Sequence, residues 1–190
     1  MWRGILKTFV LVGCVSLAPV LVPAQEVVHA LSGTVNNINL AAKTITVLTD
    51  DGSGGTFSAM TDSKKPVEFD KMLRADATAA DAFREKGARV IVYYFGEGDV
   101  RTVVALRDLG PGPFTKVSGT VVKFDRGGHS FSIKDQTGAV ESFKLTRSTV
   151  ADTGSGVVEG LKFEPAKGDQ VQVVSTQMTG SATALFVNAM

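Results

Sequence analysis

Residues 31–52 read LSGTVNNINLAAKTITVLTDDG, and residues 117–138 read VSGTVVKFDRGGHSFSIKDQTG. The two stretches align without a gap at an offset of 86 residues (117 − 31). Both begin with Ser-Gly-Thr-Val, and both continue into a segment of alternating polar and apolar residues, Thr44–Val47 in the first copy and Ser130–Ile133 in the second. A repeat of this kind indicates that the chain is built from two copies of one structural unit.

A later motif extends the repeat. Lys86-Gly87-x-x-Val90-x-Val92 returns as Lys167-Gly168-x-x-Val171-x-Val173 at an offset of 81 residues (167 − 86), so the second copy is shorter in between. Alternation with a period of two predicts strands, and Asp-Gly and Thr-Gly pairs predict the turns that separate them. We expect five strands in each unit, around Val35, Thr44–Val47, Phe57, Val90–Val92 and Val103–Leu106 in the first, and around Val121, Ser130–Ile133, Phe143, Val171–Val173 and Ala184–Val187 in the second.

The segment between the third and fourth strands differs between the copies. In the first copy, Asp70–Lys86 is rich in Ala and carries a discontinuous apolar stripe, which predicts a helix that is broken near Asp76–Thr78 and followed by Gly87 as its C′ residue. In the second copy, Asp152–Pro165 contains three glycines, which predict a loop or one short turn. The helix is therefore expected in the first unit and shortened in the second.

Three strands, a helix and two further strands follow one another in the order of the OB-fold, a five-stranded Greek-key barrel. The repeated Ser-Gly-Thr-Val and Gly-x-x-Val-x-Val patterns resemble small OB-like domains of unknown function in exported bacterial proteins, over residues 31–107 and 117–187. The resemblance implies a mainly β chain of two tandem five-stranded OB-like Greek-key barrels. It also implies a non-catalytic protein of the cell envelope.

The N-terminus has the pattern of a secretory signal peptide. Arg3 and Lys7 precede an uncharged, largely apolar run over residues 8–25, and Val22-Pro23-Ala24 resembles a small-residue cleavage site. Two alternatives stay open: the run is retained as a membrane span, or Cys14 of Leu11-Val12-Gly13-Cys14 is lipidated. The predicted location is periplasmic or secreted, with membrane attachment only through one of these two anchors.

The predicted division of the chain is a signal peptide over residues 1–24, a first barrel over 25–108, a Gly/Pro linker over 109–116 and a second barrel over 117–190. Removing the signal leaves 18 cations (20 − 2) against 19 acids, a net charge of −1. This charge argues against a nucleic-acid partner held by bulk electrostatics. Cys14 and Trp2, which are the one Cys and the one Trp of the sequence, leave with the signal, and no cofactor is expected.

One difference between the copies suggests an interface. Val90, Val92 and Tyr94 align with Val171, Val173 and Ser175, so these residues are expected to face the barrel interior. The opposite face then carries Ile91, Tyr93 and Phe95 in the first copy, against Gln172, Val174 and Thr176 in the second. An additional apolar face needs a cover. We therefore take Ile91, Tyr93 and Phe95 as ligand or interface candidates, covered by the second barrel, the helix or a partner.

Val150-Ala151-Asp152-Thr153-Gly154-Ser155-Gly156 resembles the active-site loop of aspartic peptidases. In those enzymes two aspartates share one proton, so a single motif would suffice only in a homodimer. A Gly-Ser loop accounts for the motif without catalysis, and we assign no catalytic residue. His129, which follows Gly127-Gly128, is a candidate metal ligand, together with methionines that could bind copper(I).

These patterns favour an exported, non-enzymatic binding or scaffolding protein of the bacterial cell envelope. Its partner would be an envelope protein or a small ligand that the sequence does not identify. The alternative is a periplasmic copper-binding protein that uses His129 or the methionines. A more distant alternative is an aspartic-type peptidase that acts through Asp152.

Overall fold

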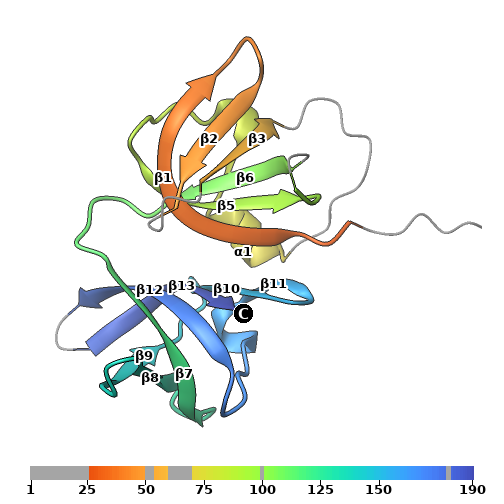
Figure 1. Cartoon of the computed structure of the whole chain (residues 1–190). Helices are drawn as coiled ribbons and strands as arrows, with labels where there is room; N and C mark the ends of the chain where they lie inside the picture. Colours follow the sequence, from red (N-terminus) through yellow and green to blue (C-terminus); the bar gives the residue numbers. More distant parts are fainter. Residues whose placement is uncertain (1–25, 50–53, 60–69, 99–100, 179–180) are drawn as a thin grey trace, which may run out of the picture.

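A computed structural model describes residues 26–49, 54–59, 70–98, 101–178 and 181–190. The predicted signal peptide over residues 1–24, including Cys14, lies outside the described residues. The chain is mainly β, and Figure 1 shows its two halves as separate sheets packed one against the other. The expected fold class is confirmed.

The first half forms a closed five-stranded barrel with one short additional strand. The strand order is β3-β2-β1-β5-β6-β4, and a parallel pairing of β3 with β6 closes the ring. β4 pairs with Ala105 and Leu106 of β6 and lies outside the ring. The bounds are β1 His29–Asn39, β2 Thr44–Leu48, β3 Gly55–Ala59, β4 Thr78–Ala79, β5 Arg89–Phe95 and β6 Thr102–Asp108.

The second half repeats this ring with a hairpin in place of the short strand. The order is β11-β10-β13-β12-β7-β8-β9, and a parallel pairing of β9 with β13 joins the ends of the five-stranded ring. The bounds are β7 Thr115–Asp125, β8 Ser130–Asp135, β9 Val140–Lys144, β10 Val150–Thr153, β11 Gly156–Glu159, β12 Gln170–Met178 and β13 Ser181–Ala189. β7 therefore begins inside the predicted linker.

The glycine of each Ser-Gly-Thr-Val motif marks a close approach between the first two strands. A Cβ atom on Gly33 would lie 2.5 Å from the Leu48 carbonyl oxygen. A Cβ atom on Gly119 would lie 2.5 Å from the Lys134 carbonyl oxygen, at the equivalent place in the second barrel. Any side chain would push the strands apart, so the motif is explained by strand spacing.

The second shared glycine precedes the fourth strand of each barrel. The Gly87 N–H donates to the Val35 carbonyl oxygen at 2.8 Å, and the Gly168 N–H donates to that of Val121 at 2.9 Å. Both glycines have a positive φ, +84° and +103°. The expectation that Gly87 ends a helix is therefore wrong: it turns the chain into β5.

The segments between the third and fourth strands correct two further expectations. The helix over Asp70–Lys86 is limited to α1, Lys71–Ala75, which Asp70 caps through the Met72 N–H and which ends at Asp76. A 3-10 turn, η1 at Ala80–Ala82, follows the strand β4. The chain leaves the helix because β4 pairs with β6 and because the side chains of Ala80 and Phe83 enter the core of the first barrel.

The segment Asp152–Pro165 was expected to be a loop, and this is wrong for its first half. β10 and β11 form a hairpin, and η2, Gly160–Lys162, follows it. β10 also pairs in parallel with β13, where Val150 lies opposite Phe186. The hairpin extends the second sheet toward the first barrel, where it builds part of the junction described below.

Candidate functional site: the junction between the barrels

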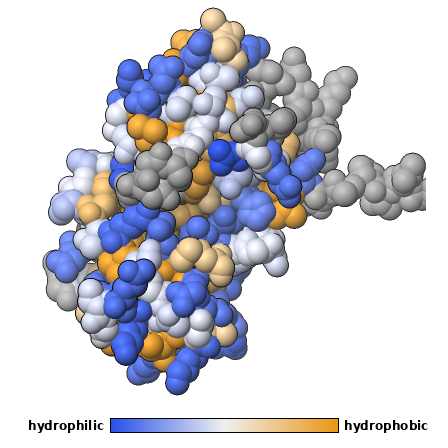
Figure 2. Space-filling view, in the orientation of Figure 1, coloured by the Kyte–Doolittle hydropathy of each residue, from blue (hydrophilic) through white to orange (hydrophobic). Residues whose placement is uncertain are grey.

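An apolar core of its own separates the two barrels. Each barrel has an interior cluster, and a third cluster contains residues from both halves of the chain. The first half contributes Val28, Ala30, Leu73, Ile91, Tyr93, Val104 and Ala105, and the second contributes Val150, Val174 and Phe186. Figure 2 shows that hydrophilic residues cover much of the outer surface on one face of the molecule.

The candidate residues Ile91, Tyr93 and Phe95 lie in this junction. Ile91 and Tyr93 are 0% exposed, and Phe95 is partly buried against the same cluster. Because side chains alternate along β5, Val90 and Val92 point into the first barrel while Ile91 and Tyr93 point out of it. Val174 of the second barrel, which occupies the equivalent outer face of β12, is part of the cover.

The predicted linker also belongs to the junction. Leu109 and Phe114 pack against the shared cluster, and the Leu109 N–H donates to the Arg89 carbonyl oxygen at 2.8 Å. The Arg89 guanidinium lies 5.9 Å from the centre of the Phe114 ring. The linker is therefore fixed by contacts near both of its ends, at Leu109 and at Phe114.

Tyr93 places a phenol in the apolar junction. Burial raises the pKa of Tyr93 to about 12, and a hydrogen bond and the positive charge of Arg107 oppose this shift. The Arg107 guanidinium also donates to the Ser148 carbonyl oxygen of the second half. Arg107 thus links the buried phenol of one barrel to the backbone of the other.

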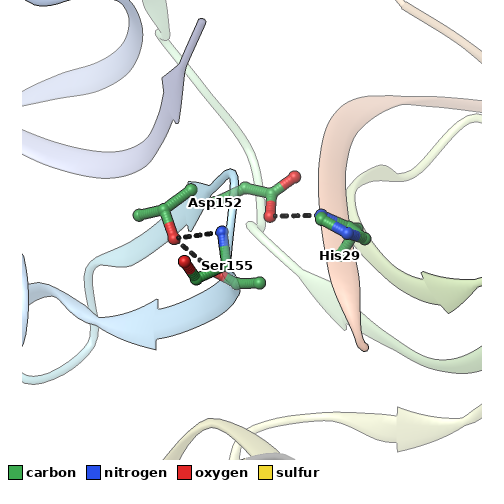
Figure 3. A network of polar contacts seen from close by, with 5 residues as sticks. His29, Asp152 and Ser155 are labelled. Carbon is green, nitrogen blue, oxygen red and sulfur yellow. Dashed lines mark hydrogen bonds and ion pairs between the residues drawn. The ribbon is translucent and has the colours of Figure 1, made fainter. Parts of the chain in front are cut away.

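The edge of the junction carries a hydrogen-bonded His–Asp pair. His29 begins β1 of the first barrel, and Asp152 lies in β10 of the second (Figure 3). The His29 Nδ1 atom is 3.0 Å from the Asp152 Oδ1 atom. Asp152 is 8% exposed, and its carboxylate also accepts the Ala30 backbone N–H. A nearly buried carboxylate therefore receives two hydrogen bonds from the opposite barrel.

The Asp-Thr-Gly-Ser motif forms the turn of the β10–β11 hairpin. The Thr153 hydroxyl donates to the Gly156 carbonyl oxygen at 2.8 Å and accepts the Ser155 N–H at 3.2 Å (Figure 3). These contacts hold Asp152 at the end of a short strand, facing the first barrel. The side chain that pairs with Asp152 is an imidazole, whereas the peptidase arrangement needs a second carboxylic acid.

Charged and aromatic side chains surround this pair. Burial raises the pKa of Asp152, while the nearby His29 and the hydrogen bonds to the carboxylate lower it. The pKa of Tyr94 is raised first by burial and then by the negative charge of Asp152, with Arg101 opposing both. The Arg101 guanidinium lies 4.5 Å from the centre of the Phe57 ring and 5.6 Å from that of Tyr94.

A second ion pair, Lys162 with Asp70, crosses the junction on its outer side. The hydrogen bond from Lys162 lowers the pKa of Asp70. The Lys162 side chain is 61% exposed, so solvent screens this pair strongly. The apolar cluster and the His29–Asp152 pair are therefore the main candidates for what holds the barrels together.

The candidate metal ligands that the structure describes lie in separate segments of the chain, while Met60 and the side chain of Met178 lie outside the described part. His129 is exposed on the turn between β7 and β8, where its φ is 45°. Met72 and Met190 are exposed at 51% and 70%. Within the described part of the chain, no three His, Cys, Asp or Glu side chains lie close enough to hold a metal ion. The copper hypothesis stays a prediction.

Each barrel carries a matching pair of hydroxyl side chains on its second and third strands. The Oγ1 atoms of Thr46 and Thr56 are 3.4 Å apart on β2 and β3. The Oγ atoms of Ser132 and Ser142, which hold the equivalent positions on β8 and β9, are 2.8 Å apart. In Figure 1 the two hairpins lie toward opposite ends of the molecule, away from the junction.

Comparison with models of known protein families and with curated proteins finds no match for this chain. Among the described residues, no helix is long and apolar enough to span a membrane.

Proposed function

We propose that the protein is an exported, non-enzymatic binding or scaffolding protein of the bacterial cell envelope, built from two OB-like barrels that act as one unit. The ring order supports the OB-like assignment. In each barrel the first three strands form a meander, and the third strand then pairs in parallel with the fifth. This is the closure expected of a five-stranded Greek-key barrel.

The observation that carries the proposal is the buried junction. The apolar face of β5, which carries the candidate residues Ile91, Tyr93 and Phe95, is occupied by the second barrel. Recognition is thereby left to the outer strands and loops, and the second and third strands are the surface on which OB-folds bind their ligands. Here that surface carries hydroxyl groups in both copies, Thr46 and Thr56 in one and Ser132 and Ser142 in the other.

The placement of these surfaces suits a scaffold. Two similar faces at opposite ends of a single unit can engage two partner molecules, or two sites on one polymer, at the same time. The N-terminal residues Arg3 to Ala24 support export to the envelope, where such polymers and their associated proteins occur. The partner is therefore proposed to be a hydroxyl- or amide-rich envelope component.

Co-sedimentation with isolated bacterial envelope fragments, membranes with attached peptidoglycan, tests this proposal. We expect the purified protein to pellet with the fragments. The double substitution Thr46→Arg and Ser132→Arg should weaken binding about tenfold, because it removes hydrogen-bonding groups and adds bulk on both faces. Thr115→Arg is the matched control, because Thr115 is an exposed residue of β7, a strand that carries neither hydroxyl pair.

The control variant should bind as the parent does. If the parent stays in the supernatant, or if the double variant binds as tightly as the parent, the proposed recognition surface is wrong. Intact mass of the protein recovered from the periplasm tests export separately, and a mass that includes residues 1–24 without lipid would contradict cleavage.

A further inference from the structure

The first described residues of the chain reach across the junction. Residues 27–30, here called the N-terminal clasp, lie at the start of β1 and contact the β10–β11 hairpin. The Val157 N–H donates to the Val28 carbonyl oxygen at 2.9 Å, which is a backbone hydrogen bond between the two halves of the chain. Val28 and Ala30 are 4% and 3% exposed in the shared cluster.

The hairpin turn is shaped to receive the clasp. Gly156 has a φ of +106°, and a Cβ atom there would lie 2.8 Å from the Val27 Cγ1 atom and 3.0 Å from the Val28 carbonyl oxygen. Glycine is needed both for the backbone conformation and for the close approach. Gly156 therefore has a structural role at the junction.

His29 lies between the two buried clasp residues and contacts Asp152. Its side chain is 33% exposed, so protons can exchange with solvent, while the Asp152 side chain is 11% exposed. The titratable or charged groups that face the pair are Tyr94, opposite His29 on β5, and Arg101, which contacts Tyr94. Burial raises the pKa of Tyr94 above its usual range. Histidine is the residue type whose charge ordinarily changes near neutral pH.

We propose that residues 27–30 form a pH-sensitive clasp, in which the His29–Asp152 ion pair holds the barrels together in mildly acidic solution and loses strength when the imidazole loses its proton. When the imidazole loses its proton, the pair loses the attraction between two opposite charges, and what remains is a contact between a neutral ring and the carboxylate. The contact between His29 and Asp152 also weakens at low pH, when acid protonates the Asp152 carboxylate. The clasp is therefore tightest at mildly acidic pH, and this inference does not depend on the proposed function.

Amide hydrogen exchange of the parent protein, measured by NMR at several pH values and corrected for intrinsic exchange rates, tests the clasp. The Val157 and Ala30 amides report the junction, and the Val47 and Ile133 amides report the two barrel interiors. We expect protection of the junction amides to fall about fivefold between pH 5.5 and pH 8, while protection of the interior amides changes little.

His29→Gln keeps a hydrogen-bonding side chain but has no charge to lose. In this variant the pH dependence at the junction should disappear, with protection near the high-pH value of the parent. His129→Gln is the matched control, because it removes the other histidine from an exposed turn and should keep the parent's pH dependence.

Two results would overturn the proposal. One is junction protection in the parent that does not change with pH. The other is a pH dependence that survives unchanged in His29→Gln. If that variant is poorly folded, the parent protein alone provides the test. The imidazole NMR signals of His29 and the amide protection of Val157 should then change over the same pH range, and changes over different ranges would contradict the proposal.

Discussion

Phe186→Ala removes the largest side chain that the second barrel places in the junction. Phe186 is 2% exposed and packs with Ile91, Tyr93 and Val174. Truncating a buried phenylalanine to alanine costs about 3–5 kcal/mol, because apolar burial is lost and the surrounding residues fill the cavity only in part. The loss of stability should affect both barrels, because Phe186 belongs to the second barrel and packs with Ile91 and Tyr93 of the first.

Urea unfolding followed by tyrosine fluorescence measures this coupling. The sequence holds two Tyr, which are Tyr93 and Tyr94 on β5 of the first barrel, so the signal reports that barrel. In the parent we expect the fluorescence transition to coincide with the loss of far-ultraviolet circular dichroism. Phe186→Ala should lower the free energy of unfolding seen by fluorescence by several kcal/mol, or separate the two transitions.

The control is Val140→Ala, at a valine of the second barrel that is 60% exposed, which should change stability by less than about 0.5 kcal/mol. Coupling between the barrels is refuted if Phe186→Ala destabilises the second barrel while the tyrosine transition of the first keeps both its midpoint and its slope. That outcome would mean that the junction transmits no stability between the barrels.

Two further predictions concern the repeat and the buried phenol. Gly33→Ala and Gly119→Ala should each lower the free energy of unfolding by about 1–3 kcal/mol, because a Cβ atom would meet a carbonyl oxygen 2.5 Å away. Gly154→Ala should have little effect, because no atom lies within 4 Å of its Cβ position. Equal losses of stability in all three variants would contradict the explanation of the motif by strand spacing. Burial raises the pKa of Tyr93 to about 12, so this side chain stays protonated in the folded protein at pH values where an unfolded tyrosine ionises. Because the folded state then binds more protons than the unfolded state, the free energy of unfolding should fall as pH rises from about 10 toward 12. In a Tyr94→Phe background, absorbance at 295 nm should show no tyrosinate near pH 10 while the protein is folded, and a normal titration there would contradict the burial of Tyr93.

The barrel strands could be predicted because their pattern is local. Alternation along Thr44–Val47 and Ser130–Ile133, and glycines at matching places, appear in both copies, so each copy supports the other. The strand that follows Gly87 was placed correctly, although the glycine was assigned to the wrong element. The positive φ of Gly87 and its hydrogen bond to Val35 belong to a turn that leads into a strand. A glycine is suited to such a turn as well as to the end of a helix.

The segments that differ between the copies were predicted less well. An Ala-rich stretch favours a helix, but pairing of Thr78 and Ala79 with β6 and burial of Phe83 override that preference after Ala75. The β10–β11 hairpin was missed because its turn residues are typical of loops and its two strands are short. Both cases are tertiary effects that no single window of sequence contains.

The candidate site was predicted in part. Comparing the copies identified Ile91, Tyr93 and Phe95 as an apolar face that needs a cover, and in the structure this face packs against the second barrel. The His29–Asp152 pair could not be predicted, because its members are 123 residues apart and no pattern in the sequence connects them. The sequence offered one indication of this pair: His29 directly follows the apolar residues Val27 and Val28, which lead into β1.

The rotational diffusion of the two barrels tests the central claim, that the junction makes them one unit. Backbone ¹⁵N relaxation can be measured separately for amides of the first barrel, such as Val47, and of the second, such as Ile133. The junction described here predicts a single rotational correlation time, that of a particle containing both barrels. Two shorter and independent correlation times, each fitting one barrel, would contradict it.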